Sequence, residues 1–109
     1  AKNHLVALPD CNIDMATSDI VASSSGCAGQ RCMAASVLLV VGDQPELMAM
    51  LKKKASALRL GQEPGQVGAI IDKASRDRIV GYINAAEKAG ATILVDGRDA
   101  SGEKTEGNW

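Results

Sequence analysis

Two of the three cysteines of this chain lie in one short stretch, GCAGQRCMAA, at residues 26–35. Cys32 follows a Gly-Gln-Arg sequence and precedes an apolar run, so a rigid backbone could hold its thiol at a cleft. A nucleophilic thiol reacts as the thiolate, which a neighbouring cation, a helix terminus or ordered backbone N–H groups stabilise. Arg31 supplies such a cation. Free cysteine is also among the most often buried side chains, and spacing alone favours a buried Cys32.

A metal centre or a disulfide is the alternative chemistry for these thiols. A structural zinc site needs about four Cys or His ligands, and the only further ones in the chain are Cys11 and His4. Their spacing matches no common zinc pattern, so we predict no metal site. A Cys27–Cys32 disulfide would have to survive a reducing compartment, and an odd number of cysteines favours free thiols. His4 begins an apolar run, which indicates a structural rather than a catalytic role.

Charge and composition exclude several classes of partner. The 109 residues carry 12 basic and 13 acidic side chains, for a net charge of -1, so the positive surface that binds nucleic acid is missing. No apolar run approaches the ~20 residues that span a bilayer, and the first residues lack the layout of a signal peptide. We therefore expect one domain, or a piece of one, in the cytoplasm, or in the mitochondrial matrix if the source is eukaryotic.

Apolar periodicity predicts the elements that must hold the cysteine stretch. The nearly continuous apolar run at residues 4–10 and the aliphatic run at 36–42 predict two buried strands, as in a parallel sheet. Between them, residues 10–26 predict a helix that is capped by Asp10 or Asn12 and weakened at its end by serines. The cysteine stretch is thus expected between this helix and the second strand.

Two more helices are predicted at residues 43–61 and 72–90, each with Gly at its end. Their expected caps are Asp43 for the first, which carries Pro45 in its first turn, and Asp72 or Ser75 for the second. The second is expected to bury Ile79, Ile83 and Ala86. Lys52–Lys54 are most simply a solvated face of the first.

The apolar run at residues 91–97 predicts a third strand, and the polar residues 98–109 predict a loop or tail. The resulting order is strand, helix, strand, helix, helix, strand. That order predicts the α/β class, a three-layer-type sandwich around a short parallel sheet. The glycines of residues 61–68 do not connect a strand to a helix, so they are expected to form turns rather than a phosphate-binding loop.

Several motifs in the chain resemble one known family. The sequence GQRCMA at residues 29–34, preceded by AKNH at 1–4 and LPDCNID at 8–14, is similar to the catalytic-cysteine segment of aldehyde dehydrogenases. GYINAAEKAGATILVDGR at 81–98 resembles the helix and strand that follow in that family. The closest likeness is to the CoA-acylating branch typified by methylmalonate-semialdehyde dehydrogenase. The resemblance covers essentially the whole chain.

The resemblance implies a specific function. Residues 1–109 would be part of an aldehyde dehydrogenase catalytic domain, without its dinucleotide-binding domain. Cys32 would attack the aldehyde, NAD would take the hydride, and CoA or water would release the resulting thioester. Arg31 would hold the carboxylate of a semialdehyde substrate, for which a guanidinium is well suited. The parent oxidoreductase would be a homo-oligomer.

The alternative interpretation is that the isolated chain is not a catalyst. A dehydrogenase must place a nicotinamide near the reacting carbon, and no dinucleotide fingerprint is present in the sequence. We expect no cofactor to bind the isolated chain and no turnover by it. It would then be a stand-alone α/β module that folds and self-associates.

Overall fold

The structure is a computed structural model that describes residues 2–98 and 107–109. It divides into two compact units, residues 1–58 and 59–109, and each is considered by itself. The elements of the first unit are β1 (Asn3–Ala7), α1 (Ile13–Ser25), the 3-10 turn η1 (Gly26–Gly29), β2 (Ala35–Val40) and α2 (Pro45–Ser56). The second unit contains α3 (Lys73–Lys88).

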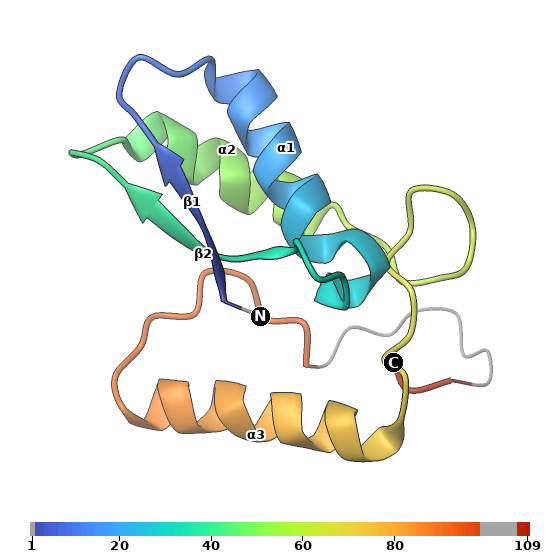
Figure 1. Cartoon of the computed structure of the whole chain (residues 1–109). Helices are drawn as coiled ribbons and strands as arrows, with labels where there is room; N and C mark the ends of the chain where they lie inside the picture. The colour runs from blue at the N-terminus through green and yellow to red at the C-terminus, as the bar shows by residue number, and fades with distance from the viewer. Residues whose placement is uncertain (1, 99–106) are drawn as a thin grey trace. The chain divides into compact units, whose positions relative to one another are not determined.

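The two strands of the first unit form a parallel sheet, as predicted (Figure 1). Two parallel strands cannot be joined by a tight turn, and here α1 makes the crossover between them. His4 pairs with Val37 and Ala7 with Val40, whereas Asn3 pairs with Ala35. Ser36 is therefore an extra residue in β2, a bulge at the end of the sheet where the cysteine stretch joins it.

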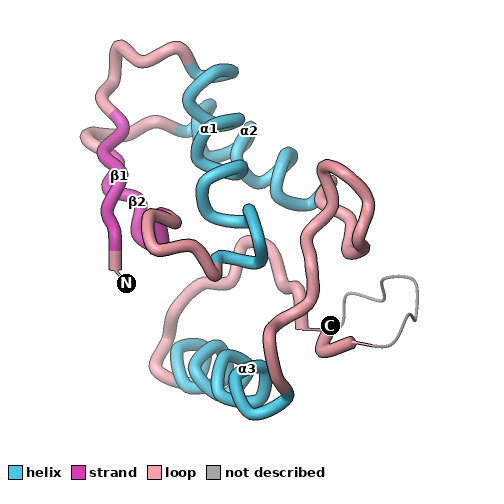
Figure 2. The backbone as a smooth tube through the Cα atoms, turned by 45° about the vertical axis from the view of Figure 1, so that its right-hand side comes forward, coloured by secondary structure: helices cyan, strands magenta, loops and turns pink. Residues whose placement is uncertain are grey.

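Both helices of the first unit cover the same face of this sheet (Figure 2). Side chains of α1, α2 and both strands surround one cavity of about 260 Å³. Leu47 of α2 and Thr17 of α1 are fully buried, and the Thr17 hydroxyl donates to the carbonyl of Ile13 at 2.7 Å. Val6 and Leu39 are paired on the other face, where they are 59% and 49% exposed. The first unit thus contains the sheet and one helical layer.

Lys54 does not belong to the solvated face that the sequence predicts. Its side chain is only 24% exposed, and its ammonium group donates to the carbonyl and carboxylate of Asp14 at 2.7 Å and to the hydroxyl of Ser18 at 2.6 Å. The hydrogen bond from Lys54 to the Asp14 carboxylate and the positive charge of the lysine lower the pKa of that carboxyl. The prediction that Lys54 faces solvent is wrong because its three acceptors lie on another helix, about forty positions earlier in the sequence.

The helix caps are partly as predicted. Asn12 caps α1 by accepting from the N–H of Met15, and Asp72 caps α3 by accepting from Ser75. Asp43 is wrong as the cap of α2, because the helix begins after Gln44. The Gln44 side chain instead donates to the carbonyls of Ala7 and Val41, at 3.1 and 2.8 Å, and so ties the end of β2 to β1. The helix also stops at Ser56, before the predicted glycine.

The second unit departs further from the sequence prediction. Residues 91–97 form no strand, and Leu94 and Val95 are 48% and 40% exposed. A strand needs a partner backbone as well as apolar side chains, and the described residues of this unit pair only in isolated bridges. The predicted apolar face of α3 is likewise not buried: Ile79 is 40% exposed. The α/β class and the short parallel sheet are confirmed, but the third strand is wrong.

The last described residues of the chain pair with the segment before α3. Asn108 forms an antiparallel bridge with Ile70, whose N–H donates to the Asn108 carbonyl at 3.0 Å. Arg76 donates to the carbonyl of Trp109. Of the predicted loop at 98–109, residues 99–106 lie outside the described residues. Within the part of the chain that is described, no helix has both the length and the apolar character to cross a bilayer.

Arg98 is the centre of the polar contacts in the second unit. Its side chain is largely buried and donates to both carboxylate oxygens of Asp96. The same guanidinium reaches Asn84 at 2.7 Å and Glu87 at 2.8 Å, both on α3. The hydrogen bonds from Arg98 lower the pKa of Asp96 to about 2. This network fastens residues 96–98 to the helix.

The lowered pKa of Asp96 predicts acid sensitivity. A carboxyl with a folded pKa of about 2 and an ordinary value of 3.8 stabilises the fold above pH 3.8, and this contribution is lost as the pH falls toward 2. We expect urea unfolding to show stability decreasing over that window, with a smaller decrease in Asp96→Asn. An equal decrease in the variant would contradict the assignment.

Candidate active site

Arg31–Ala34 form a tight turn, here called the cysteine turn, that connects η1 to β2. The N–H of Ala34 donates to the carbonyl of Arg31 at 3.1 Å, which closes the turn around Cys32 and Met33. Cys32 is exposed and free. Spacing alone favours a buried Cys32, and that expectation is wrong: Cys32 is exposed on the turn before β2, the position along the chain that the sequence predicts.

The backbone before the cysteine turn is left-handed over three consecutive residues. Cys27 and Ala28 both have φ 53°, and Gly29 has φ 72°. Two of these residues carry a Cβ, and each such residue costs about 1–2 kcal/mol in this conformation. Glycine is favoured at position 29 for a second reason, since a Cβ there would lie only 3.2 Å from the carbonyl oxygen of Ser24. The chain therefore reverses direction sharply between α1 and the cysteine turn.

Hydrogen bonds from two different elements fix the cysteine turn. From β1, the Asn3 side-chain amide donates to the carbonyl of Cys32 at 2.9 Å and to that of Ala34 at 3.2 Å. From α1, the hydroxyl of Ser23 accepts from the N–H of Ala35 at 3.2 Å. The sequence suggested that serines would weaken the end of α1. One of them instead fastens the helix to the start of β2.

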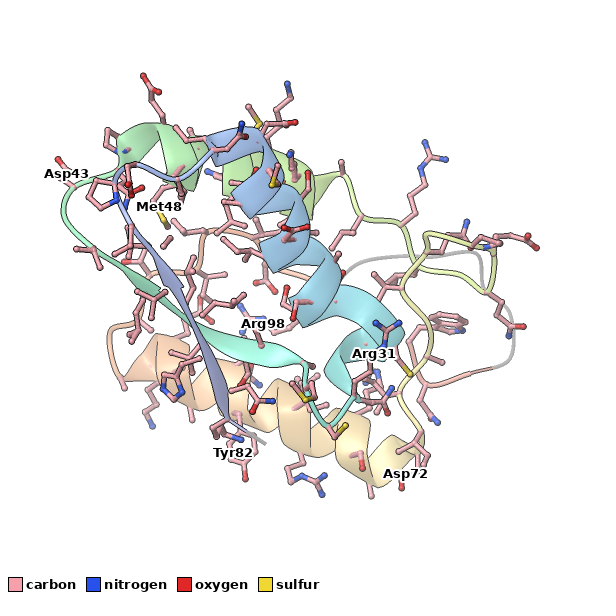
Figure 3. All side chains as sticks on the ribbon, turned by 45° about the horizontal axis from the view of Figure 1, so that its top comes forward. Arg31, Asp43, Met48, Asp72, Tyr82 and Arg98 are labelled. Carbon is pink, nitrogen blue, oxygen red and sulfur yellow. The ribbon has the colours of Figure 1, made fainter. Side chains whose placement is uncertain are left out.

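The guanidinium of Arg31 lies back against Gly26, the residue that ends α1 (Figure 3). A Cβ at Gly26 would come within 2.8 Å of the Arg31 Nη1 atom, so only glycine leaves this space free. Arg31 is exposed and forms no ion pair within the described residues. Within the described part of the chain, no carboxylate neutralises its charge.

The backbone N–H of Cys32 is a second potential donor at this position. It gives no hydrogen bond to any residue in 2–98 or 107–109. A free N–H on the residue that bears the thiol can stabilise negative charge on an oxygen of a molecule that the sulfur attacks. The turn therefore combines a thiol, a backbone donor and a guanidinium within two consecutive residues.

The remaining candidates do not join this group. His4 is exposed on β1, and the described residues contain no Cys–His hydrogen bond. Cys27 is exposed, Cys11 is half-buried, and all three cysteines are free. Among the residues that the structure describes, no three His, Cys, Asp or Glu side chains gather closely enough to hold a metal.

No dinucleotide-binding loop is formed in the described part of the chain. Such a loop is rich in glycine and lies between a parallel strand and the N-terminus of the next helix. The corresponding connection here, from β1 to α1, has the sequence LPDCN and no glycine. This connection therefore forms no glycine-rich phosphate-binding loop.

Asn3 and Ser23 are the site residues that sequence reasoning missed. Asn3 was noted only as part of a motif, and Ser23 only as a helix-weakening residue. A polar residue at the start of a buried strand is unusual, since its side chain needs a partner. That signal could have drawn attention to Asn3, but only the structure identifies its acceptors.

Comparison with known proteins gives a consistent result. Residues 1–109 match the family described as "Aldehyde dehydrogenase family". The chain is 38% identical to malonate-semialdehyde dehydrogenase of Bacillus cereus (strain B4264) over 111 aligned positions, which cover 98% of this chain and 23% of that protein. It therefore spans less than a quarter of the length of such curated relatives.

Solved structures agree with the sequence match. One, from Sinorhizobium meliloti 1021, has the proposed activity of a methylmalonate-semialdehyde dehydrogenase and is complexed with NAD. It matches 95% of this chain and 22% of its own length, with 32% identity and a TM-score of 0.82. A mutant aldehyde dehydrogenase from Bacillus cereus matches 99% of this chain and 22% of its own, with 25% identity and a TM-score of 0.82.

The left-handed backbone before the cysteine turn makes a prediction about stability. Ala28→Gly removes a Cβ from a position with φ 53° and should raise the free energy of unfolding by about 1 kcal/mol. The control is Ala22→Gly, in the exposed face of α1, which should lower it by about 1 kcal/mol. Urea unfolding measures both, and a loss of stability in Ala28→Gly would contradict the left-handed conformation.

Proposed function

The chain belongs to the aldehyde dehydrogenase family, and we propose that it supplies the nucleophile and the substrate anchor of an enzyme that oxidises a carboxylated semialdehyde. The observation that carries this proposal is the exposed Arg31–Cys32 pair on a turn that β1 and α1 hold in place. Malonate semialdehyde and methylmalonate semialdehyde, the substrates named for the relatives, both carry a carboxylate next to the reactive aldehyde.

Cys32 begins the reaction by covalent attack. Its thiolate sulfur forms a bond to the aldehyde carbon, and the carbonyl π electrons move to the oxygen. The N–H of Cys32 donates to this oxygen, where negative charge develops. Oxidation of the resulting thiohemiacetal gives a thioester, which CoA then releases. The proposed product is an acyl-CoA.

Arg31 provides the selectivity for a carboxylate. Its guanidinium can donate two parallel hydrogen bonds to the carboxylate of the substrate, while the aldehyde at the other end reaches the neighbouring thiol. The short chain of a malonate-type substrate suits two binding groups on consecutive residues. In this proposal Arg31 selects the charge of the substrate and Cys32 its reactive aldehyde.

NAD is the proposed hydride acceptor of the longer enzyme. The related structure from Sinorhizobium meliloti is complexed with it. The chemistry proposed for this chain's own residues is the covalent adduct and its positioning. Without the rest of such an enzyme, the chain would be a folding module without turnover, which is the competing interpretation.

Protection of Cys32 by an aldehyde tests the proposal. We would alkylate the chain with iodoacetamide and measure the rate at each cysteine by peptide mass spectrometry. Malonate semialdehyde should slow the labelling of Cys32 in a saturable manner, and Cys27 is the internal control. Arg31→Met should raise the half-protecting concentration about tenfold, with no change for neutral propanal. No protection in the unmodified chain would favour the non-catalytic module.

A substitution at Gly26 tests the role of Arg31 more sharply. Gly26→Ala changes the position of the guanidinium and leaves its charge unchanged. Gly26 has an ordinary φ of -55°, so Gly26→Ala strains no backbone and only displaces the flexible Arg31 side chain. Protection by malonate semialdehyde should weaken several-fold and protection by propanal should not change. Equal weakening for both aldehydes would indicate a disturbed turn instead.

A further inference from the structure

Asn3 makes two hydrogen bonds to the cysteine turn from a different element. Both come from its Nδ2 group, which reaches the carbonyl of Cys32 at 2.9 Å and the carbonyl of Ala34 at 3.2 Å. A side-chain amide nitrogen carries two hydrogens, and these two acceptors use both. The residue is half-buried on β1, about thirty positions before the turn in sequence. Its amide is therefore committed to this one turn.

A bulge in β2 lies beside the contact between the Asn3 side chain and the cysteine turn. Asn3 pairs with Ala35 and the next pair is His4 with Val37, so Ser36 is left out of the ladder. A bulge bends the strand and changes the direction of nearby side chains. The register shift follows the Asn3–Ala35 pair, which is the pair next to the cysteine turn. Asn3 contacts the carbonyls of Cys32 and Ala34 at this same place.

We infer that Asn3 is a positioning residue for Cys32, which fixes the direction of the Cα–Cβ bond that carries the thiol relative to the N–H of the same residue. This inference rests on the proposed function. The peptide before Cys32 is held by the bond from Ala34 to the carbonyl of Arg31. The peptide after Cys32 is held by Asn3. The two backbone angles of Cys32 lie between these anchored planes.

The fixed backbone angles of Cys32 matter when its thiol adds to an aldehyde, but they do not matter when the thiol is alkylated by iodoacetamide. Attack on an aldehyde needs the sulfur on the carbon and the N–H on the oxygen at the same time. Iodoacetamide needs only an accessible thiolate. Loss of the Asn3 bonds should therefore weaken the first reaction selectively, a split that a purely structural defect would not produce.

The test uses two variants of the chain and a matched control. Asn3→Asp replaces both donors by an oxygen that repels the two carbonyls, and Asn3→Ala removes the donors without adding charge. The control is Asn12→Asp, the same chemical change at a residue whose side-chain oxygen only accepts, from the N–H of Met15. An aspartate keeps that cap. Thermal unfolding confirms that each variant is folded.

Two measurements are made on each protein. The first is protection of Cys32 from iodoacetamide by propanal, a neutral aldehyde that does not involve Arg31. We expect the half-protecting concentration to rise about tenfold or more in both Asn3 variants, with the alkylation rate without aldehyde unchanged in Asn3→Ala, which adds no charge beside the thiol. The second is hydrogen exchange of the amides of residues 32–35, which should be faster in the Asn3 variants only.

The outcomes separate the inference from the proposed function. Unchanged exchange and unchanged protection in the Asn3 variants would overturn the positioning role while leaving Cys32 as the nucleophile. Equal losses in alkylation and in protection would also overturn it, because they would indicate a general disturbance. Absence of protection in the unmodified chain would overturn the proposed function, and the positioning role falls with it, whatever the exchange shows.

Discussion

The parallel pairing of β1 with β2 is the constraint on which the first unit depends. Parallel strands start at the same edge of a sheet, so the chain must leave the far end of β1 and return through α1 before β2 can begin. The cysteine turn is the last part of that return. It necessarily lies beside the start of β1, which is where Asn3 is found. A residue early in the sequence can therefore hold a turn that follows about thirty positions later.

The sequence predicted those parts of the fold whose signals are local. Asn12 and Asp72 were identified as caps because a cap acts on a backbone group only three residues away. Both strands of the sheet were found because each is a short, dense apolar run. The turn containing Cys32 and Arg31 was located for the same reason, from its glycine and its neighbours. Their roles came from a family resemblance, and those roles remain predictions.

What sequence could not supply is the identity of distant partners. Lys54 was assigned to solvent because a run of lysines carries no sign of the Asp14 carboxylate that it meets. Residues 91–97 have the composition of a strand, yet composition records only a preference for burial, and a strand also needs a second backbone to pair with. The exposure of Cys32 is a further example. Its place just before the strand was predicted, but the frequent burial of free cysteine carries no information about the turn that exposes it.

The arrangement around Cys32 joins exposure to rigidity, and these two properties usually oppose each other. An exposed turn is ordinarily mobile, because few contacts restrain it. Here the restraint comes from hydrogen bonds to backbone carbonyls and N–H groups, which leave the side chains of the turn in contact with solvent. Cys27 and Ala28 adopt the left-handed conformation although a glycine would be less strained there. This combination supports the role proposed for Cys32, because a thiol that attacks a small molecule in one orientation needs both properties, whereas a packing cysteine needs neither.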